Sequence, residues 1–386
     1  MEGDLLRINK WLLPLSWLYG AGVALRNTLF DIGVLKSYSY NIPIINIGNL
    51  TVGGTGKTPH TEYIIRLLSQ SHKVAVLSRG YKRKSSGYVL ATMDSTVEEI
   101  GDEPWQMKQK FPNIYVAVDK NRRGGIERLC SDEETRDVEV ILLDDAYQHR
   151  YVQPGLNILL VDSHRMITED RLLPAGRLRE PRGNTNRADI VIVTKCPTDI
   201  TPMEFHVLQK KLGLMPFQSL FFSTFHYGQM YSLSGKNSQS LNDLHPQENI
   251  LLLTGIASPE QMKLDLEAHT SHITPLPFPD HHFFTADDAS LINRTFASLP
   301  SPKSIITTEK DAPRLKLLPG LSEEVKAALY VLPVEVDIIR KEKQNFNDKI
   351  TGYVFQNPRN RNVAQDHHEN ESHNRHHPWH RSGTFS

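Results

Sequence analysis

Cysteine is scarce in this chain of 386 residues, which contains only Cys130 and Cys196. The two lie far apart and lack the spacing of metal-binding cysteine pairs, so the sequence argues against a disulfide framework and a cysteine-ligated metal site. Two isolated thiols suit the reducing cytosol, and we expect both to be small buried hydrophobic groups.

The sequence also has no excess of charge of either sign, because 44 basic side chains balance 44 acidic ones. No global field therefore attracts nucleic acid, for which we predict no role, and any anionic ligand must meet a local basic patch. The length and the 39% hydrophobic content favour two globular domains, or one domain with an appendage. We expect a monomer.

No apolar run is long enough to cross a bilayer, which takes about 20 residues. The longest uncharged stretch, residues 11–25, is shorter and is interrupted by Pro14, Gly20 and Gly22. A signal peptide has a similar pattern, but a cytosolic phosphate-binding loop follows almost at once. Two interpretations remain at this point: a segment lying on a membrane surface, or an ordinary core helix.

The other end of the chain, residues 356–386, is rich in Asn, Arg and His and nearly free of aliphatic residues. It cannot bury enough apolar surface to offset its ordering entropy, so we predict a disordered tail. Its histidines could bind a metal ion opportunistically, but low complexity is the simpler interpretation.

Short β-branched runs alternate with helical patterns through the first half of the chain. They lie at 42–48, 73–80, 113–118, 138–145, 156–162 and 188–195. Nearly continuous apolar strands indicate a parallel sheet buried on both faces, hence a doubly wound α/β fold of the P-loop NTPase type. A second, smaller α/β set follows. The predicted segments are an N-terminal apolar helix at 1–40, a P-loop domain at 41–225, a smaller domain at 226–355 and the tail.

A glycine-rich turn joins the first strand to the first predicted helix, and this context gives the motif its meaning. Amide groups of such a turn surround phosphate oxygens, Lys57 would reach the β- and γ-phosphates of a nucleotide, and Thr58 would bind Mg²⁺. The usual first glycine is replaced by Thr51. The predicted nucleotide-binding residues are Thr51, Val52, Gly53, Gly54, Thr55, Gly56, Lys57 and Thr58.

Two pairs of carboxylates supply candidate metal ligands and a candidate base. Asp144 and Asp145 end an apolar strand, as the Mg²⁺-binding acid of a P-loop enzyme does. Asp102 and Glu103 open a predicted helix, where an acid can simply cap the helix or can position an acceptor hydroxyl. The predicted metal ligands are Thr58, Asp144, Asp145 and Glu103.

Several basic loops follow the predicted strands and suggest a second anionic group on the substrate. In the second domain, "FPDHHFF" places two histidines beside Asp280, either as a structural pair or facing a phosphate. The predicted substrate-binding residues are Arg79, Tyr81, Arg122, Arg123, Gln148, His149, Arg171 and Arg177.

The motifs "NIGNLTVGGTGKTP", "LSRGYKR", "GDEPWQM", "VDKNRRGG", "ILLDDAYQH", "LLPAGRLREP", "FPDHHFF" and "TTEKDAPRL" occur in this order. Together they resemble the tetraacyldisaccharide 4'-kinase family of lipid A biosynthesis, over residues 5 to 340. That family has Thr at the position of Thr51, and its acidic motif more often reads DDGFQH, so Ala146 and Tyr147 depart from it.

The resemblance implies transfer of the ATP γ-phosphate to the 4'-hydroxyl of an acylated glucosamine disaccharide 1-phosphate, with Mg²⁺, at the cytoplasmic face of the inner membrane. It implies that Asp102 is the catalytic carboxylate, with His281 as its partner and Lys57 on the phosphates. It also favours the membrane-surface interpretation of the N-terminal segment.

Two other functions fit parts of the sequence. A P-loop metallochaperone or switch NTPase could use the His-rich tail, but the nearest candidate for a guanine-reading motif, "VTKCPTD", lacks its Asn. A soluble small-metabolite kinase would leave the apolar N-terminus without a purpose.

Overall fold

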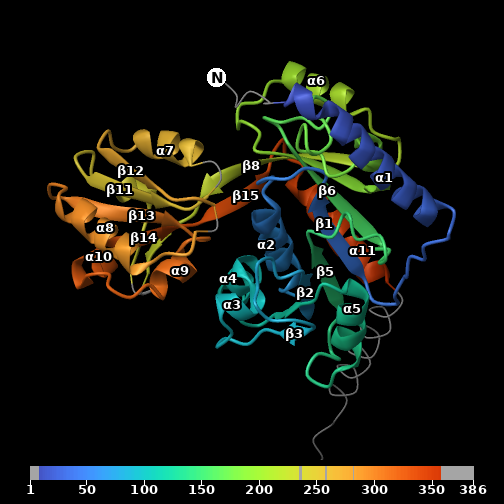
Figure 1. Cartoon of the computed structure of the whole chain (residues 1–386), viewed down its shortest axis with the longest axis horizontal. Coiled ribbons are helices and arrows are strands. Elements are labelled where there is room, and N and C mark those ends of the chain that lie inside the picture. Colours follow the sequence, from blue (N-terminus) through green and yellow to red (C-terminus); the bar gives the residue numbers. More distant parts are fainter. Residues whose placement is uncertain (1–7, 234–236, 257–258, 281, 358–386) are drawn as a thin grey trace, which may run out of the picture.

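The computed structural model describes residues 8–233, 237–256, 259–280 and 282–357. These residues form two sheets, each with its own helices, joined mainly by strands β8 and β15, which run between the two bodies (Figure 1). The predicted tail lies almost entirely outside the described residues, as does His281.

The larger sheet has nine strands in the order β15-β8-β7-β6-β1-β5-β2-β4-β3. Its inner pairs are parallel, and only the edge pairs β15–β8 and β3–β4 are antiparallel. This confirms the predicted mainly parallel α/β sheet. The strands are β1 (Ile44–Asn49), β2 (Val74–Ser78), β3 (Val89–Leu90), β4 (Tyr115–Val118), β5 (Val140–Asp144), β6 (Leu156–Asp162), β7 (Ile190–Thr194), β8 (Ser219–Tyr227) and β15 (Val334–Ile338).

Both faces of this sheet are covered, which explains why β1 and β5 are buried at every position and why apolar residues occur at successive positions rather than only at alternate ones. Ile45 and Ile47 of β1 pack in a core with α2, α4 and α11, whereas Ile44 packs on the other face in a core with α5. The helices of this body are α1 (Leu13–Asp31), α2 (Lys57–Leu68), α3 (Val97–Ile100), α4 (Asp102–Lys110), α5 (Arg122–Ser131), α6 (Pro202–Leu212) and α11 (Lys343–Gln356), with short 3₁₀ helices at Lys10–Leu12 and Arg182–Arg187.

The smaller sheet has the order β10-β9-β14-β13-β11-β12 and a separate apolar core. Its strands are β9 (Met230–Ser232), β10 (Ser238–Gln239), β11 (Asn249–Thr254), β12 (Ile273–Pro277), β13 (Lys303–Thr308) and β14 (Leu329–Leu332). Its helices are α7 (Glu260–Glu267), α8 (Ala286–Ala297), α9 (Ala312–Lys316) and α10 (Glu323–Ala328), with a 3₁₀ turn at Leu241–Asp243.

The end of the described chain returns to the larger body, which differs from the predicted extent of the smaller domain. β15 adds to the large sheet beside β8, and α11 packs against α2. Val336, Phe346 and Ile350 are buried in the core of the large sheet, so apolar burial draws this segment back. The predicted range 226–355 therefore ends too late for the smaller domain.

The apolar N-terminal segment forms α1 and the turn before it, and much of its apolar surface faces solvent. Trp11 is 92% exposed, and Trp17 and Leu18 are each 72% exposed. None of the helices in the described ranges is both long and apolar enough to cross a membrane.

Candidate active site

The glycine-rich loop leaves the carboxyl end of β1 and opens into α2, as the sequence predicts. Gly53 and Gly56 have φ values of 111° and 85°, in the left-handed region that favours glycine. A Cβ atom on Gly56 would lie 2.4 Å from the Phe225 ring. Only glycine therefore fits this last turn before the helix.

Buried side chains and a neighbouring segment hold the loop in shape. Asn49 Nδ2 donates to Thr55 Oγ1 at 2.8 Å, and Thr194 Oγ1 donates to the Thr55 carbonyl oxygen at 3.0 Å. On the other side, Val52 N donates to the Arg177 carbonyl oxygen, and Arg179 N donates to that of Leu50. These hydrogen bonds tie the loop to β7 and to the segment 177–179.

Two carboxylates stand at the end of β5, the strand next to β1: Asp144 is its last residue and Asp145 follows it. Asp144 is 3% exposed, and its Oδ1 atom has no hydrogen-bond partner among the residues the structure describes. Burial, with the negative charges of Glu103 and Asp145, raises the pKa of Asp144 to about 7. An unpaired buried carboxylate oxygen facing further carboxylates is suited to a cation.

The second carboxylate is held by two cations. Lys57 Nζ lies 3.7 Å from Asp145 Oδ1, and Arg179 contacts both oxygens of Asp145 at 3.1 and 3.2 Å. Burial opposes ionisation, but Lys57 and Arg179 together lower the pKa of Asp145. Lys57, Asp145 and Arg179 therefore form one charged group at the mouth of the loop.

Helix α4 brings the other acidic pair to the same site. Asp102 and Glu103 form its first turn after Gly101, and Glu103 is close enough to Asp144 to raise the pKa of that group. Arg314, from α9 of the smaller body, lies 3.7 Å from Asp102 Oδ2. The two bodies therefore meet at Asp102.

Positive side chains surround His149 in the loop after β5. Burial, together with the positive charges of the nearby guanidinium groups of Arg122, Arg26 and Arg79, lowers the pKa of His149 to about 4. The buried Nε2 atom of His149 has no hydrogen-bond partner among the described residues. A neutral imidazole near these arginines can donate an N–H hydrogen bond to an anionic ligand.

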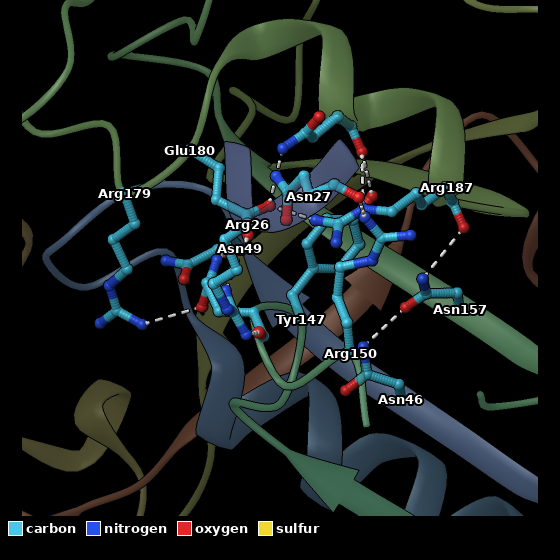
Figure 2. Close-up of polar contacts among 12 residues, drawn as sticks. Arg26, Asn27, Asn46, Asn49, Tyr147, Arg150, Asn157, Arg179, Glu180 and Arg187 are labelled. Atoms are coloured by element: carbon cyan, nitrogen blue, oxygen red, sulfur yellow. Dashed lines mark hydrogen bonds and ion pairs between the residues drawn. The ribbon is translucent and has the colours of Figure 1, made fainter. Parts of the chain in front are cut away.

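Helix α1 is tied to this part of the site by polar contacts (Figure 2). Arg26 donates to the Gln148 carbonyl oxygen at 2.7 Å, and Arg150 donates to that of Asn27 at 3.0 Å. Tyr19 Oη donates to the Arg179 carbonyl oxygen at 2.8 Å. The apolar helix and the phosphate loop are thus parts of one packed unit.

The chain matches a known family over most of its length. The family model described as tetraacyldisaccharide-1-P 4'-kinase matches residues 8–354. The chain belongs to this family.

Relatives support this assignment over nearly the full length. The chain is 57% identical to a tetraacyldisaccharide 4'-kinase of Phocaeicola vulgatus, over 94% of this chain and all of that protein. It is 46% identical to the protein of the same name from Porphyromonas gingivalis, over 91% of this chain and 99% of that one. A crystal structure of an LpxK from Aquifex aeolicus in complex with ATP matches with a TM-score of 0.68 and 29% identity, covering 89% of this chain and 98% of that chain. The predicted family is confirmed, and membership decides against the metallochaperone and the small-metabolite kinase.

The structure gathers most of the predicted kinase-family residues at the carboxyl ends of β1, β2 and β5. Gln148 lines the loop, since its Nε2 donates to the Asn49 carbonyl oxygen at 2.7 Å. Arg177 lies beside Gly53, with a guanidinium nitrogen 3.9 Å from the place of a Cβ atom there. Half-buried Thr58 follows Lys57 in the first turn of α2.

Other predicted substrate-binding residues have different surroundings. Arg122 is 2% exposed and donates to the backbone carbonyls of Asp119 and Asp144. Arg123 stacks over the Tyr38 ring, and an Arg171 nitrogen contacts the Asp170 carbonyl oxygen. Tyr81 is 57% exposed. Roles in substrate binding stay predictions for these four, as they do for Arg79, Gln148, His149 and Arg177.

Two arginines matter more than the sequence indicated. Arg179 belongs to the quoted motif "LLPAGRLREP", but only the structure pairs it with Asp145. Arg314 belongs to the quoted motif "TTEKDAPRL", yet no spacing rule predicts that it meets Asp102.

Proposed function

We propose that the chain transfers the γ-phosphate of ATP to the 4'-hydroxyl of tetraacyldisaccharide 1-phosphate, through the residues described above. The kinase activity itself follows from family membership. The observation that supports the division of roles is the meeting of the phosphate loop, Lys57–Asp145 and Asp102 at one site.

The loop amides and Lys57 would bind the phosphates. Residues 51–58 present backbone N–H groups at the start of α2, where the helix dipole also favours anions. Lys57 exchanges its contact with Asp145 for the β- and γ-phosphates, while Arg179 stays on Asp145. Positive charge aimed at the transferring group stabilises the transition state.

The residues present fit Mg²⁺. Asp144 offers a buried, unpaired oxygen close to Glu103, and Thr58 in the first turn of α2 would supply a hydroxyl. Within the described residues no three His, Cys, Asp or Glu side chains gather closely enough to hold an ion by themselves. This agrees with Mg²⁺, which usually takes one or two carboxylates and completes its ligands with phosphates and water. When bound, it would offset the phosphate charge.

Asp102 is the proposed general base. Its carboxylate accepts the proton of the 4'-hydroxyl, the hydroxyl oxygen bonds to the γ-phosphorus, and the bond to the β–γ bridging oxygen breaks to release ADP. We assign His281 the orientation of Asp102, as the family resemblance implies. Arg79 and His149 would meet the 1-phosphate of the acceptor.

We further propose that the chain works at the cytoplasmic face of the inner membrane through α1 and the 3₁₀ turn before it, which carries Trp11. An acceptor with several acyl chains resides in a bilayer, and the exposed Trp11, Trp17 and Leu18 offer apolar surface to it. Burial at about 25 cal/mol per Å² would give useful surface affinity.

The test is transfer of labelled γ-phosphate from ATP to tetraacyldisaccharide 1-phosphate in detergent. We expect Mg²⁺-dependent product from the native chain and losses of at least about 100-fold in Asp102→Ala and Lys57→Ala. Lys120→Ala, an exposed lysine of a neighbouring loop, is the matched control. Full activity in Asp102→Ala would remove the base role, and absence of product from the native chain would reject the substrate.

A further inference from the structure

The segment Glu309–Arg314, between β13 and the end of the first turn of α9, contacts both halves of the proposed catalytic apparatus. Arg314 faces Asp102 at 3.7 Å, and Glu309 contacts Lys110 at 2.6 Å. Lys310 Nζ donates to Asp280 Oδ1 at 2.6 Å, in the loop that carries the predicted histidine partner. The proposed mechanism does not involve the side chains of this segment.

Its contacts hold α4 at both ends. Asp102 is the first residue of α4 and Lys110 the last, about 12 Å apart along a helix of this length. Lys110 also contacts buried Glu62 of α2 at 2.7 Å. The smaller body, α4 and the helix of the phosphate loop therefore share one ion cluster.

Residues of its own segment hold the Arg314 side chain in place. It is 8% exposed, and its Nη2 atom donates to Asp311 Oδ1 and to the Lys310 carbonyl oxygen, both at 3.1 Å. Asp311 is fully buried and accepts from Gly255 N at 2.8 Å and Thr308 Oγ1 at 2.7 Å. These bonds fix the direction in which the guanidinium points.

The other side of the guanidinium points at Asp102. Arg314 Nη1 is buried and has no hydrogen-bond partner among the described residues, although the Asp102 carboxylate lies 3.7 Å away. A buried guanidinium is costly unless a carboxylate balances it. Across the junction of the two bodies, the Asp102 carboxylate thus balances the charge of Arg314.

We propose that Arg314 is a positioning residue for Asp102, so that the place of the smaller body determines where the base stands. This inference rests on the proposed base role of Asp102. Arg314 acts through the carboxylate and not on the nucleotide, so its loss lowers kcat and leaves the KM for ATP nearly unchanged.

The first test is steady-state kinetics of Arg314→Gln, with Arg314→Lys as the charge-keeping variant and Lys316→Gln as control. Lys316 lies on the same helix and is exposed. We expect kcat to fall about 10- to 100-fold in Arg314→Gln, because small misplacements of a reacting group have effects of this size. Arg314→Lys should recover most of it, and Lys316→Gln should match the native chain. A rise in the KM for ATP with unchanged kcat would overturn the proposal.

A double-mutant cycle with Asp102→Asn distinguishes positioning from a general structural role. If Arg314 acts through Asp102, adding Arg314→Gln to Asp102→Asn lowers kcat by no more than about twofold further. A full multiplicative loss would overturn the inference and leave the base role intact. Native-level activity of Asp102→Asn alone would remove both. If Arg314→Gln fails to fold, Arg314→Lys replaces it in the cycle. Its smaller loss of kcat should then disappear when the Asp102→Asn substitution is already present.

Discussion

At the scale of single residues, two neighbouring glycines of the phosphate loop differ in what they tolerate. Gly56 needs a positive φ and has the Phe225 ring against it, whereas a Cβ atom on Gly54 would meet nothing within 4 Å. Substitution of Gly56 should therefore affect the folding of the loop, whereas substitution of Gly54 should not.

We predict that Gly56→Ala lowers the free energy of unfolding by roughly 1–3 kcal/mol without nucleotide, since left-handed backbone and a ring clash both add cost. Gly54→Ala should change it by less than about 0.5 kcal/mol. Urea unfolding of the nucleotide-free chains measures both. Equal destabilisation by the two variants would contradict the assignment.

The two thiols also differ. Burial raises the pKa of the Cys196 thiol to about 12, whereas Cys130 is only half-buried. We predict that at pH 8 a thiol reagent labels Cys130 promptly and Cys196 only after unfolding, because the thiolate is the reactive form. Cys130→Ser should leave no promptly reacting thiol, and prompt labelling of that variant would show that Cys196 is accessible.

At the scale of elements, α1 combines an exposed apolar face with polar contacts to the catalytic loops. The proposed membrane contact and the contacts to the catalytic loops would thus use different faces of one helix. Substitutions on the exposed face should separate the two.

We predict that Trp11→Ser with Trp17→Ser weakens binding to phosphatidylglycerol-containing vesicles at least tenfold, because two exposed indoles lose their apolar burial. Activity on detergent-dispersed substrate should stay within about twofold. Phe355→Ser is the control, because Phe355 is an aromatic residue of α11 that is 58% exposed. Helix α11 packs on one face of the large sheet. Helix α1 contacts Leu172, which packs on the other face. Vesicle flotation is the measurement, and equal flotation of all three chains would reject α1 as the contact.

At the scale of the whole molecule, the junction between the two bodies contains a buried ion cluster. Lys110 lies between Glu62 and Glu309. Burial opposes its positive charge, but the two carboxylates outweigh burial and raise the pKa of Lys110. Its removal would leave two carboxylates facing each other.

We predict that Lys110→Met destabilises the chain by about 3–5 kcal/mol, the usual effect of removing one partner from a buried pair. It should also split unfolding into two steps, because the bodies lose a shared contact. Lys120→Met, an exposed lysine, is the control in calorimetry. A single transition at the native temperature would show that the cluster does not join the bodies.

The strands, the phosphate loop and the acids that follow β5 could be predicted because each depends on local patterns. Continuous apolar runs predict doubly covered strands, and glycines before a Lys-Thr pair predict a phosphate cradle. The site at the strand ends then follows from the parallel arrangement, since carboxyl ends of parallel strands share an edge. The motifs also carried the family resemblance.

Other features depended on contacts between distant segments, which no local pattern records. The return of β15 and α11 to the large sheet depends on core space beside β8 that only the folded sheet creates. Arg179 and Asp145 are 34 residues apart, and Arg314 and Asp102 lie still farther apart in the chain. The sequence by itself determined the kinds of elements and the chemistry of the loop, because these follow from spacing. The tertiary structure alone decided which charges face each other, because that depends on how the two bodies pack.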